Sequence, residues 1–140
     1  MIKLTETTIQ DVEQLSEWIQ VDPYHFHQGQ PEWWLTGAEG SLLAFCLMDE
    51  RGPLSYVRLD AEGEYVRIHT QFAPELVVSK RRLVVGMIWA VKCLVVMYKS
   101  WGKGFVFNSI NSSLIAFMNK HLGFKPVGNN DYRLDFEGQQ

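Results

Sequence analysis

The segment from Leu83 to Tyr98 is almost entirely apolar, and it limits the folds that this chain can adopt. It is shorter than the roughly 20 residues that cross a bilayer, and Lys92 lies near its middle. We therefore expect a buried helix rather than a membrane span. Ser79 is a typical N-cap residue, which predicts a helix from Lys80 to about Ser100. Because this helix is apolar on nearly all sides, we expect both of its sides to be covered.

Length and composition indicate one globular domain over residues 1–140, since 46% of the 140 residues are hydrophobic. The net charge of −3 offers no positive field for nucleic acid. The polar start of the chain does not match a signal peptide. Cys46 and Cys93 lie inside apolar runs without metal-like spacing, so we expect reduced core thiols in a cytoplasmic protein.

Three strands separated by turns precede the long helix. They are predicted from Leu42 to Met48, Leu54 to Leu59 and Tyr65 to Phe72, with turns at 49–52 and 60–63. In the third strand one face is mainly apolar and the other polar, because side chains alternate along a strand. The apolar face carries Val66, Ile68, Thr70 and Phe72, and the polar face carries Arg67, His69 and Gln71.

The two ends of the chain carry local start and stop signals. A strand over 2–5 is followed by a helix that Thr8 and Asp11 begin and that Asp22-Pro23 ends. After the long helix we expect a strand over 105–107, a helix from Asn111 to Gly123, and strands over 124–127 and 132–136. Residues 22–40 have no clean period, although Trp33, Trp34 and Leu35 can start a short helix or strand.

This order of elements resembles the GNAT superfamily of acyl-CoA-dependent N-acetyltransferases over nearly the whole chain. The most specific part is 111–124, which looks like the family's C-terminal motif: Asn111 opens a helix that ends in Gly123-Phe124. The resemblance implies an α/β (α+β) fold with a central mixed, mostly antiparallel sheet of about six to seven strands flanked by about three to four helices. The C-terminal half is also loosely similar to acetyltransferase-like internal virion proteins of short-tailed phages.

The resemblance implies acetyl-CoA as cosubstrate, held in a wedge where the fourth and fifth strands separate. Its pyrophosphate would lie on backbone N–H groups at the start of the long helix, where the helix dipole favours anions. The consecutive cations at 80–82 suit such a phosphate, and a solvated basic face is the alternative. The cofactor-binding residues implied are Phe72, Val78, Ser79, Lys80, Arg81, Arg82, Asn108 and Asn111.

The sequence departs from the family signature Arg/Gln-x-x-Gly-x-Gly/Ala at 82–87. The single Gly86 comes one residue late, and Met87 takes the second small position. We expect the bulky residues 83–85 to fill space that a pyrophosphate would occupy. Asn119 stands where the family often has a tyrosine that acts as the acid for the leaving thiolate.

His69 and Glu75 are the candidate bases for deprotonating an amine. Histidine titrates near neutral pH, and His69 lies on the polar face of the predicted fourth strand. A hydrogen-bonded strand histidine and an ordinary loop carboxylate are the alternative interpretations. His25 and His27 form a pair without a third ligand at recognisable spacing, so no metal site is expected.

Three functions remain open from the sequence. The first is an N-acetyltransferase acting on a small-molecule or protein amine. The second is an inactive GNAT-like structural or interaction protein, and the third is a ligand-binding domain without turnover.

The long helix carries Val85, Trp89 and Val96, which would suit a homo-oligomer or assembly interface if they lie on an uncovered side of the helix. Cover by the segment 22–40 is the alternative. Neither nucleic acid nor a membrane is an expected partner.

Overall fold

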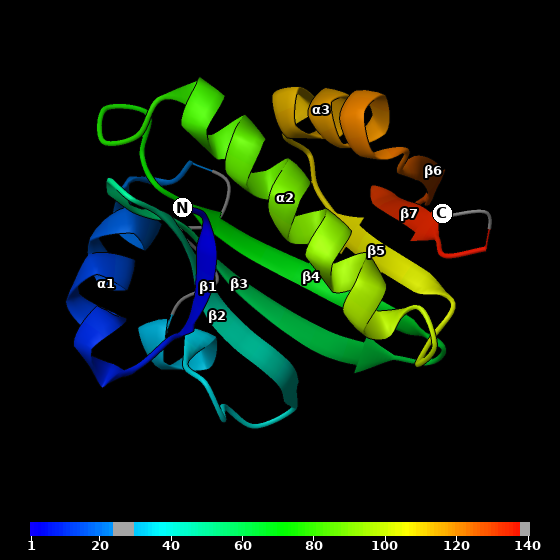
Figure 1. The fold of residues 1–140 in the computed structure, drawn as a ribbon, viewed down its shortest axis with the longest axis horizontal. Helices are drawn as coiled ribbons and strands as arrows, with labels where there is room; N and C mark the ends of the chain where they lie inside the picture. The colour runs from blue at the N-terminus through cyan, green and yellow to red at the C-terminus, as the bar shows by residue number, and fades with distance from the viewer. Residues whose placement is uncertain (24–29, 138–140) are drawn as a thin grey trace.

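The computed structural model describes residues 1–23 and 30–137 (Figure 1). Its centre is a seven-stranded sheet in the order β1-β2-β3-β4-β5-β7-β6. All neighbouring strands are antiparallel except β4 and β5, which run parallel. The predicted mixed, mostly antiparallel sheet is therefore confirmed, and the described residues form three α-helices around it.

The N-terminal half forms β1 to β4 as the sequence predicts. Thr8 donates its backbone N–H to Asp11 Oδ2 at 2.8 Å and accepts the Asp11 N–H at 2.8 Å, which begins the first helical turn. The elements are β1 (Lys3–Glu6), a 3-10 turn η1 (Ile9–Asp11), α1 (Val12–Val21), η2 (Pro31–Trp34), β2 (Ser41–Asp49), β3 (Gly52–Glu62) and β4 (Tyr65–Phe72). β3 continues through most of the predicted turn at 60–63.

The C-terminal half contains α2 (Lys80–Tyr98), β5 (Gly104–Asn108), α3 (Ser112–Leu122), β6 (Lys125–Gly128) and β7 (Asp131–Asp135). Both helices begin at their predicted caps. Ser79 Oγ accepts the Arg82 N–H at 3.3 Å, and Asn111 Oδ1 accepts two N–H groups of the first turn of α3. Gly123 ends α3 with φ 81, a left-handed conformation that glycine adopts without strain.

The side chains of β3 divide the molecule into two layers of packing. Tyr56 and Arg58 face α1 and η2: the Tyr56 ring lies 5.2 Å from Trp18, and Arg58 contacts Trp33. The residues that alternate with these two along the strand, such as Val57, face the opposite side, where α2 and α3 cover the sheet. In Figure 1, α2 crosses the sheet diagonally with α3 beside it.

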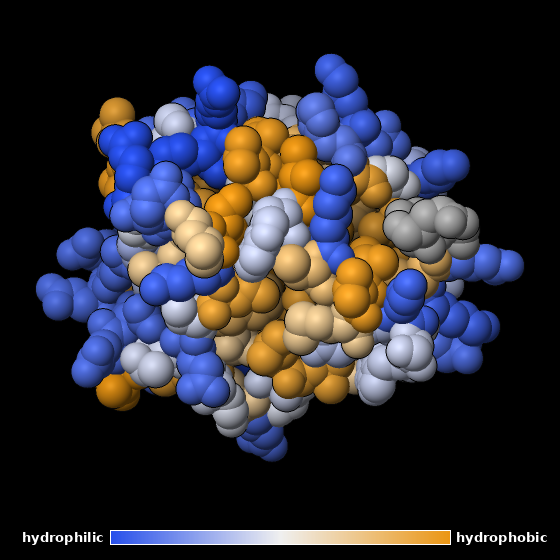
Figure 2. All heavy atoms as spheres, viewed as in Figure 1, coloured by the Kyte–Doolittle hydropathy of each residue, from blue (hydrophilic) through white to orange (hydrophobic). Residues whose placement is uncertain are grey.

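Within the described residues the outer side of α2 is exposed, so the expectation of a helix buried on both sides is wrong for this part of the chain. Val85 is 50% exposed, Val96 70% and Met97 54%. Figure 2 shows apolar side chains gathered on this face of the molecule, over α2. The described residues 31–34 do not cover this side, because η2 packs against α1 and β3 on the other face of the sheet.

Both cysteines are free thiols. Cys46 is buried and Cys93 is half-buried. Burial, with Asp11 nearby, raises the pKa of the Cys46 thiol to about 12, so this thiol is inert at neutral pH. Among the described residues, no helix has the length and apolar character to cross a membrane.

Candidate functional site

The parallel strands β4 and β5 pair only at their beginnings. Tyr65 lies opposite Gly104, Val66 opposite Phe105 and Arg67 opposite Val106, and no further pair follows in the described chain. β4 continues to Phe72 and β5 to Asn108, each still paired with its other neighbour. The facing backbone groups beyond Arg67 are therefore left without the partners that a sheet provides, and they are available to a ligand.

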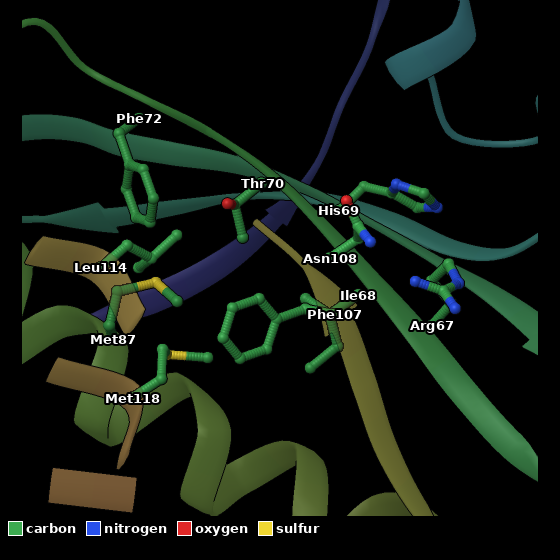
Figure 3. A pocket seen from close by; sticks show the side chains of 10 residues that line it. All are labelled: Arg67, Ile68, His69, Thr70, Phe72, Met87, Phe107, Asn108, Leu114 and Met118. Carbon is green, nitrogen blue, oxygen red and sulfur yellow. The ribbon is translucent and has the colours of Figure 1, made fainter. Parts of the chain in front are cut away.

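A cavity of about 90 Å³ lies in this wedge between the strands (Figure 3). One side of its wall is apolar, where Met87 from α2 and Met118 from α3 point into it, and the other side is polar. The cavity is small beside the roughly 300–1,000 Å³ of typical ligand pockets. Thioether side chains rearrange easily, so these two methionines are the parts of the wall that a larger ligand can displace. The lining residues are Arg67, Ile68, His69, Thr70, Phe72, Met87, Phe107, Asn108, Leu114 and Met118.

His69 lies at the polar edge of the cavity, on the side of β4 opposite the methionines (Figure 3). Its side chain is 24% exposed, its Nε2 lies 3.5 Å from Asp60 Oδ2, and its ring meets Trp33 edge to face with centroids 4.8 Å apart. Burial lowers the pKa of His69, although the Asp60 carboxylate opposes this. The imidazole is therefore neutral at pH 7 and can accept a proton.

Arg67 and Asn108 complete the polar edge. Arg67 forms paired hydrogen bonds with Glu62 and with Asp131, which hold the pKa of both carboxyls below the usual value. Asn108 Nδ2 donates to Asp131 Oδ1 at 3.0 Å and to Asn129 O at 3.0 Å. Through Asp131 at the start of β7, these contacts link Arg67, the last residue of β4 that pairs with β5, to Asn108 at the end of β5.

The start of α2 presents free backbone donors. Ser79 Oγ accepts the Arg82 N–H, and the Ser79 carbonyl oxygen accepts the Leu83 N–H. Within the described chain, the backbone N–H groups of Lys80 and Arg81 therefore have no hydrogen-bond partner. Lys80 and Arg81 are exposed. Together with the helix dipole, these donors favour an anion at this end of α2.

The other residues of the α2 start are engaged in packing or pairing. Val78 is 3% exposed and lies in the core. The Arg82 guanidinium is bound by Asp49 through two hydrogen bonds. The bulky residues at 83–85 do not all fill the space near the helix start, since Val85 is half exposed on the outer side of α2.

Gly86 serves helix–sheet packing. A Cβ at this position would lie 2.6 Å from Leu54 Cδ1 and 3.3 Å from Leu47 Cδ2. Both leucines are fully buried. The single glycine of the segment 82–87 therefore allows α2 to approach β2 and β3, and it faces the sheet.

The remaining candidate residues lie away from the cavity. Glu75 is exposed in the turn after β4. Asn111 caps α3. Asn119 donates Nδ2–H to Phe124 O at 2.8 Å and closes the other end of α3. Asn119 is not among the lining residues, and an amide is no proton donor for a thiolate in any case.

Of the predicted site residues, the structure brings His69, Phe72 and Asn108 together at one cavity. Met118 and Leu114, which also line the cavity, are not among the predicted site residues. Asp60 was assigned to a turn, and no local sequence signal pairs it with a histidine on the next strand. His25 and His27 lie outside the described residues, and the described ones contain no cluster of three or more metal-ligating side chains.

The comparisons with solved structures identify a shared fold. An aminoglycoside acetyltransferase, AAC(6')-Ib, in complex with coenzyme A and kanamycin matches with a TM-score of 0.73 at 16% identity, covering 99% of each chain. The ribosomal-protein-S18-alanine N-acetyltransferase from Escherichia coli matches with a TM-score of 0.66 at 13% identity, over 97% of this chain and 94% of that one.

A GNAT family acetyltransferase from Brucella melitensis, in complex with acetyl-CoA, matches with a TM-score of 0.62 at 15% identity over 97% of this chain and 88% of that one. No family model matches the sequence. No curated protein matches it either. The likeness to the GNAT acetyltransferases is therefore one of fold, and it extends over nearly the full length of both partners.

Proposed function

We propose that this chain, which has the GNAT fold, is a cytoplasmic N-acetyltransferase that binds acetyl-CoA in the wedge and transfers the acetyl group to an amine. The observation that carries the proposal is the separation of β4 from β5 after Arg67 and Val106, which opens a cavity beside a neutral histidine. In support, structural neighbours with the same fold are complexes with coenzyme A or acetyl-CoA.

The start of α2 fits the pyrophosphate of acetyl-CoA through its backbone. The free N–H groups of Lys80 and Arg81, with their exposed positive side chains, would hold the phosphate oxygens. The unpaired backbone groups of β4 and β5 that face the wedge would form hydrogen bonds with the amide groups of the pantetheine arm. Phe72 would line the path of this arm. The arm does not fit the cavity at its present volume, so Met87 and Met118 would have to move aside.

The thioester supplies an activated acetyl group, and His69 would supply the base. Neutral His69 accepts a proton from the attacking amine while the new N–C bond forms and the C–S bond breaks. None of the described lining residues is an acid suited to the thiolate, so the thiolate would take its proton from the resulting imidazolium or from water. Glu75 remains an alternative base acting through water from its exposed turn.

The acceptor is proposed to be a small-molecule amine. Neighbouring structures with this fold hold kanamycin or paromomycin together with a CoA ligand, which makes aminoglycosides reasonable first probes. A protein amine is the other candidate, because another neighbour is named for acetylating an alanine of a ribosomal protein.

Calorimetric titration with acetyl-CoA tests the proposal at its first step. We expect micromolar binding that weakens as salt concentration rises, since phosphate contacts are electrostatic. A panel of amines that includes kanamycin then tests transfer, with His69→Gln as the inactive control. No binding at millimolar acetyl-CoA would contradict the proposal.

A structural or interaction protein without activity is the second candidate. The exposed apolar side chains of Val85, Val96 and Met97 on α2 favour it, because apolar surfaces of this kind often mark protein interfaces. The absence of an acid among the described lining residues also agrees with it. Under this alternative, acetyl-CoA does not bind and the protein associates in sedimentation experiments, and Val96→Lys reduces the association.

A further inference from the structure

The polar faces of β3 and β4 carry an ordered group of charged side chains beside the wedge. In the strand register Arg58 lies directly opposite His69, and Asp60 lies directly opposite Arg67. These four side chains share one face of the sheet, and Trp33 from η2 covers two of them, contacting Arg58 and His69. The group therefore borders the cavity on the side away from the two methionines.

Arg58 organises the group. It is 3% exposed, and its guanidinium lies 4.0 Å from the centroid of the Trp33 ring. Nη1 donates to Trp33 O at 2.7 Å and Nη2 to Glu39 O at 2.8 Å, while Nε donates to Asp60 Oδ1 at 2.7 Å. A buried arginine with this many partners holds Trp33 and Asp60 in single positions.

Both groups that Arg58 holds also contact His69. Asp60 Oδ2, the oxygen not bound by Arg58 Nε, lies 3.5 Å from His69 Nε2. The Trp33 ring meets the imidazole at an interplanar angle of 80°. The imidazole is thus held from β3 by a carboxylate and from η2 by an aromatic ring. This arrangement joins η2 to the consecutive strands β3 and β4, and nothing in hydrophobic packing requires it.

We infer that Asp60 is a positioning residue for His69: it accepts the Nε2–H, selects that tautomer and leaves the lone pair on Nδ1 as the base. The role of Nδ1 as the base rests on the proposed N-acetyltransferase activity, whereas the assignment of the tautomer does not. Arg58 binds the other oxygen of Asp60, and Asp60 does not itself take the proton. After proton transfer the carboxylate stabilises the imidazolium.

The charges around His69 determine the sign of the expected effects. Asp60 and Arg58 face it from β3 and Arg67 from β4, while Trp33 on η2 is uncharged. The carboxylate favours the imidazolium and the two arginines oppose it. Replacing Asp60 by asparagine removes the attraction of the adjacent carboxylate and leaves Arg58 less compensated, so the pKa of His69 falls further.

Nitrogen-15 NMR of the apo protein tests the inference without any substrate. His69→Gln assigns the signals, and Asp60→Asn is the test variant. Asp135→Asn, a carboxylate of β7 that pairs with Arg133, is the matched control. In the wild type we expect the Nε2–H tautomer of His69. In Asp60→Asn we expect a lower pKa and a smaller excess of the Nε2–H tautomer, with Asp135→Asn unchanged in both.

Two results overturn the inference: an Nδ1–H tautomer in the wild type, or the same tautomer and pKa for His69 in Asp60→Asn. Circular dichroism on each variant verifies that it is folded. Should Asp60→Asn not fold, Asp60→Ala takes its place in the same comparison. Acetyl transfer is measured separately as kcat/KM against pH. If the wild type has the Nε2–H tautomer but transfers no acetyl group, only the proposed function is contradicted. If the wild type transfers acetyl and Asp60→Asn has the same kcat/KM at every pH, only the positioning role is contradicted.

Discussion

Arg82 in the first turn of α2 is bound by Asp49 at the end of β2, with Nη2–Oδ1 at 2.6 Å and Nε–Oδ2 at 2.8 Å. The two side chains are only 17% and 13% exposed. Arg82 is therefore committed to an internal carboxylate, and it ties the start of the long helix to the sheet. The cations at 80–82 are not equivalent, because only Lys80 and Arg81 remain exposed.

Asp49→Asn is expected to weaken the fold in a pH-dependent way. The hydrogen bond from Arg82 lowers the pKa of Asp49 from 3.8 to about 2. A carboxyl with a depressed pKa stabilises the native state above its unfolded pKa, and this contribution is lost as the pH falls from about 4 toward about 2. Urea midpoints should thus differ between wild type and variant at pH 7 and converge as the pH falls toward about 2. A constant difference over this range would contradict the assignment.

Arg81→Ala and Arg82→Ala are expected to affect acetyl-CoA binding differently. Arg81 is free to contact a phosphate, so its removal should weaken binding several-fold and reduce the salt dependence. Arg82→Ala should leave the affinity nearly unchanged but lower the urea midpoint. Calorimetry and urea unfolding of the two variants separate these effects, and equal losses of affinity would contradict the distinction.

Met87→Ala is expected to increase the affinity for acetyl-CoA, because it removes a side chain that narrows the wedge. The variant should lose about 2–5 kcal/mol of stability, as buried methionine truncations do. Met97→Ala is the matched control on the same helix, since Met97 is 54% exposed and faces away. Met118→Ala opens the same cavity from α3 and serves if Met87→Ala does not fold.

The four outcomes of this binding experiment are distinct. Tighter binding by Met87→Ala than by the wild type supports both the wedge site and the role of Met87. Binding by the variant alone would mean that Met87 closes the site. If the two proteins bind acetyl-CoA equally well, the wedge site stands but Met87 does not narrow it. If neither protein binds acetyl-CoA, both the wedge site and the role of Met87 are rejected.

Gly86→Ala is expected to destabilise the protein although alanine is the better helix former. The new Cβ would press on Leu54 and Leu47, and overpacking costs about 1–3 kcal/mol, against which the helix propensity gains roughly 1 kcal/mol. Val85→Ala on the exposed side of α2 is the control. A more stable Gly86→Ala in urea unfolding would show that the two leucines move aside without cost.

Local signals in the sequence determined most helix and strand boundaries. Ser79 predicted the start of α2, and Asn111 and Gly123 predicted both ends of α3, because capping depends on residues within one turn of each other. The alternation in β4 predicted that His69 lies on its polar face. The sequence also indicated the GNAT fold, since the order of elements is a property of the chain alone.

Only the tertiary structure decided what surrounds those residues. The separation of β4 from β5 after Arg67, the contact of Asp60 with His69 and the binding of Arg82 by Asp49 all depend on strand register and helix position. These partners lie on different elements, and no short-range pattern encodes their distances. The sequence by itself thus determined the elements and their order, whereas packing between distant segments decided the geometry of the candidate site.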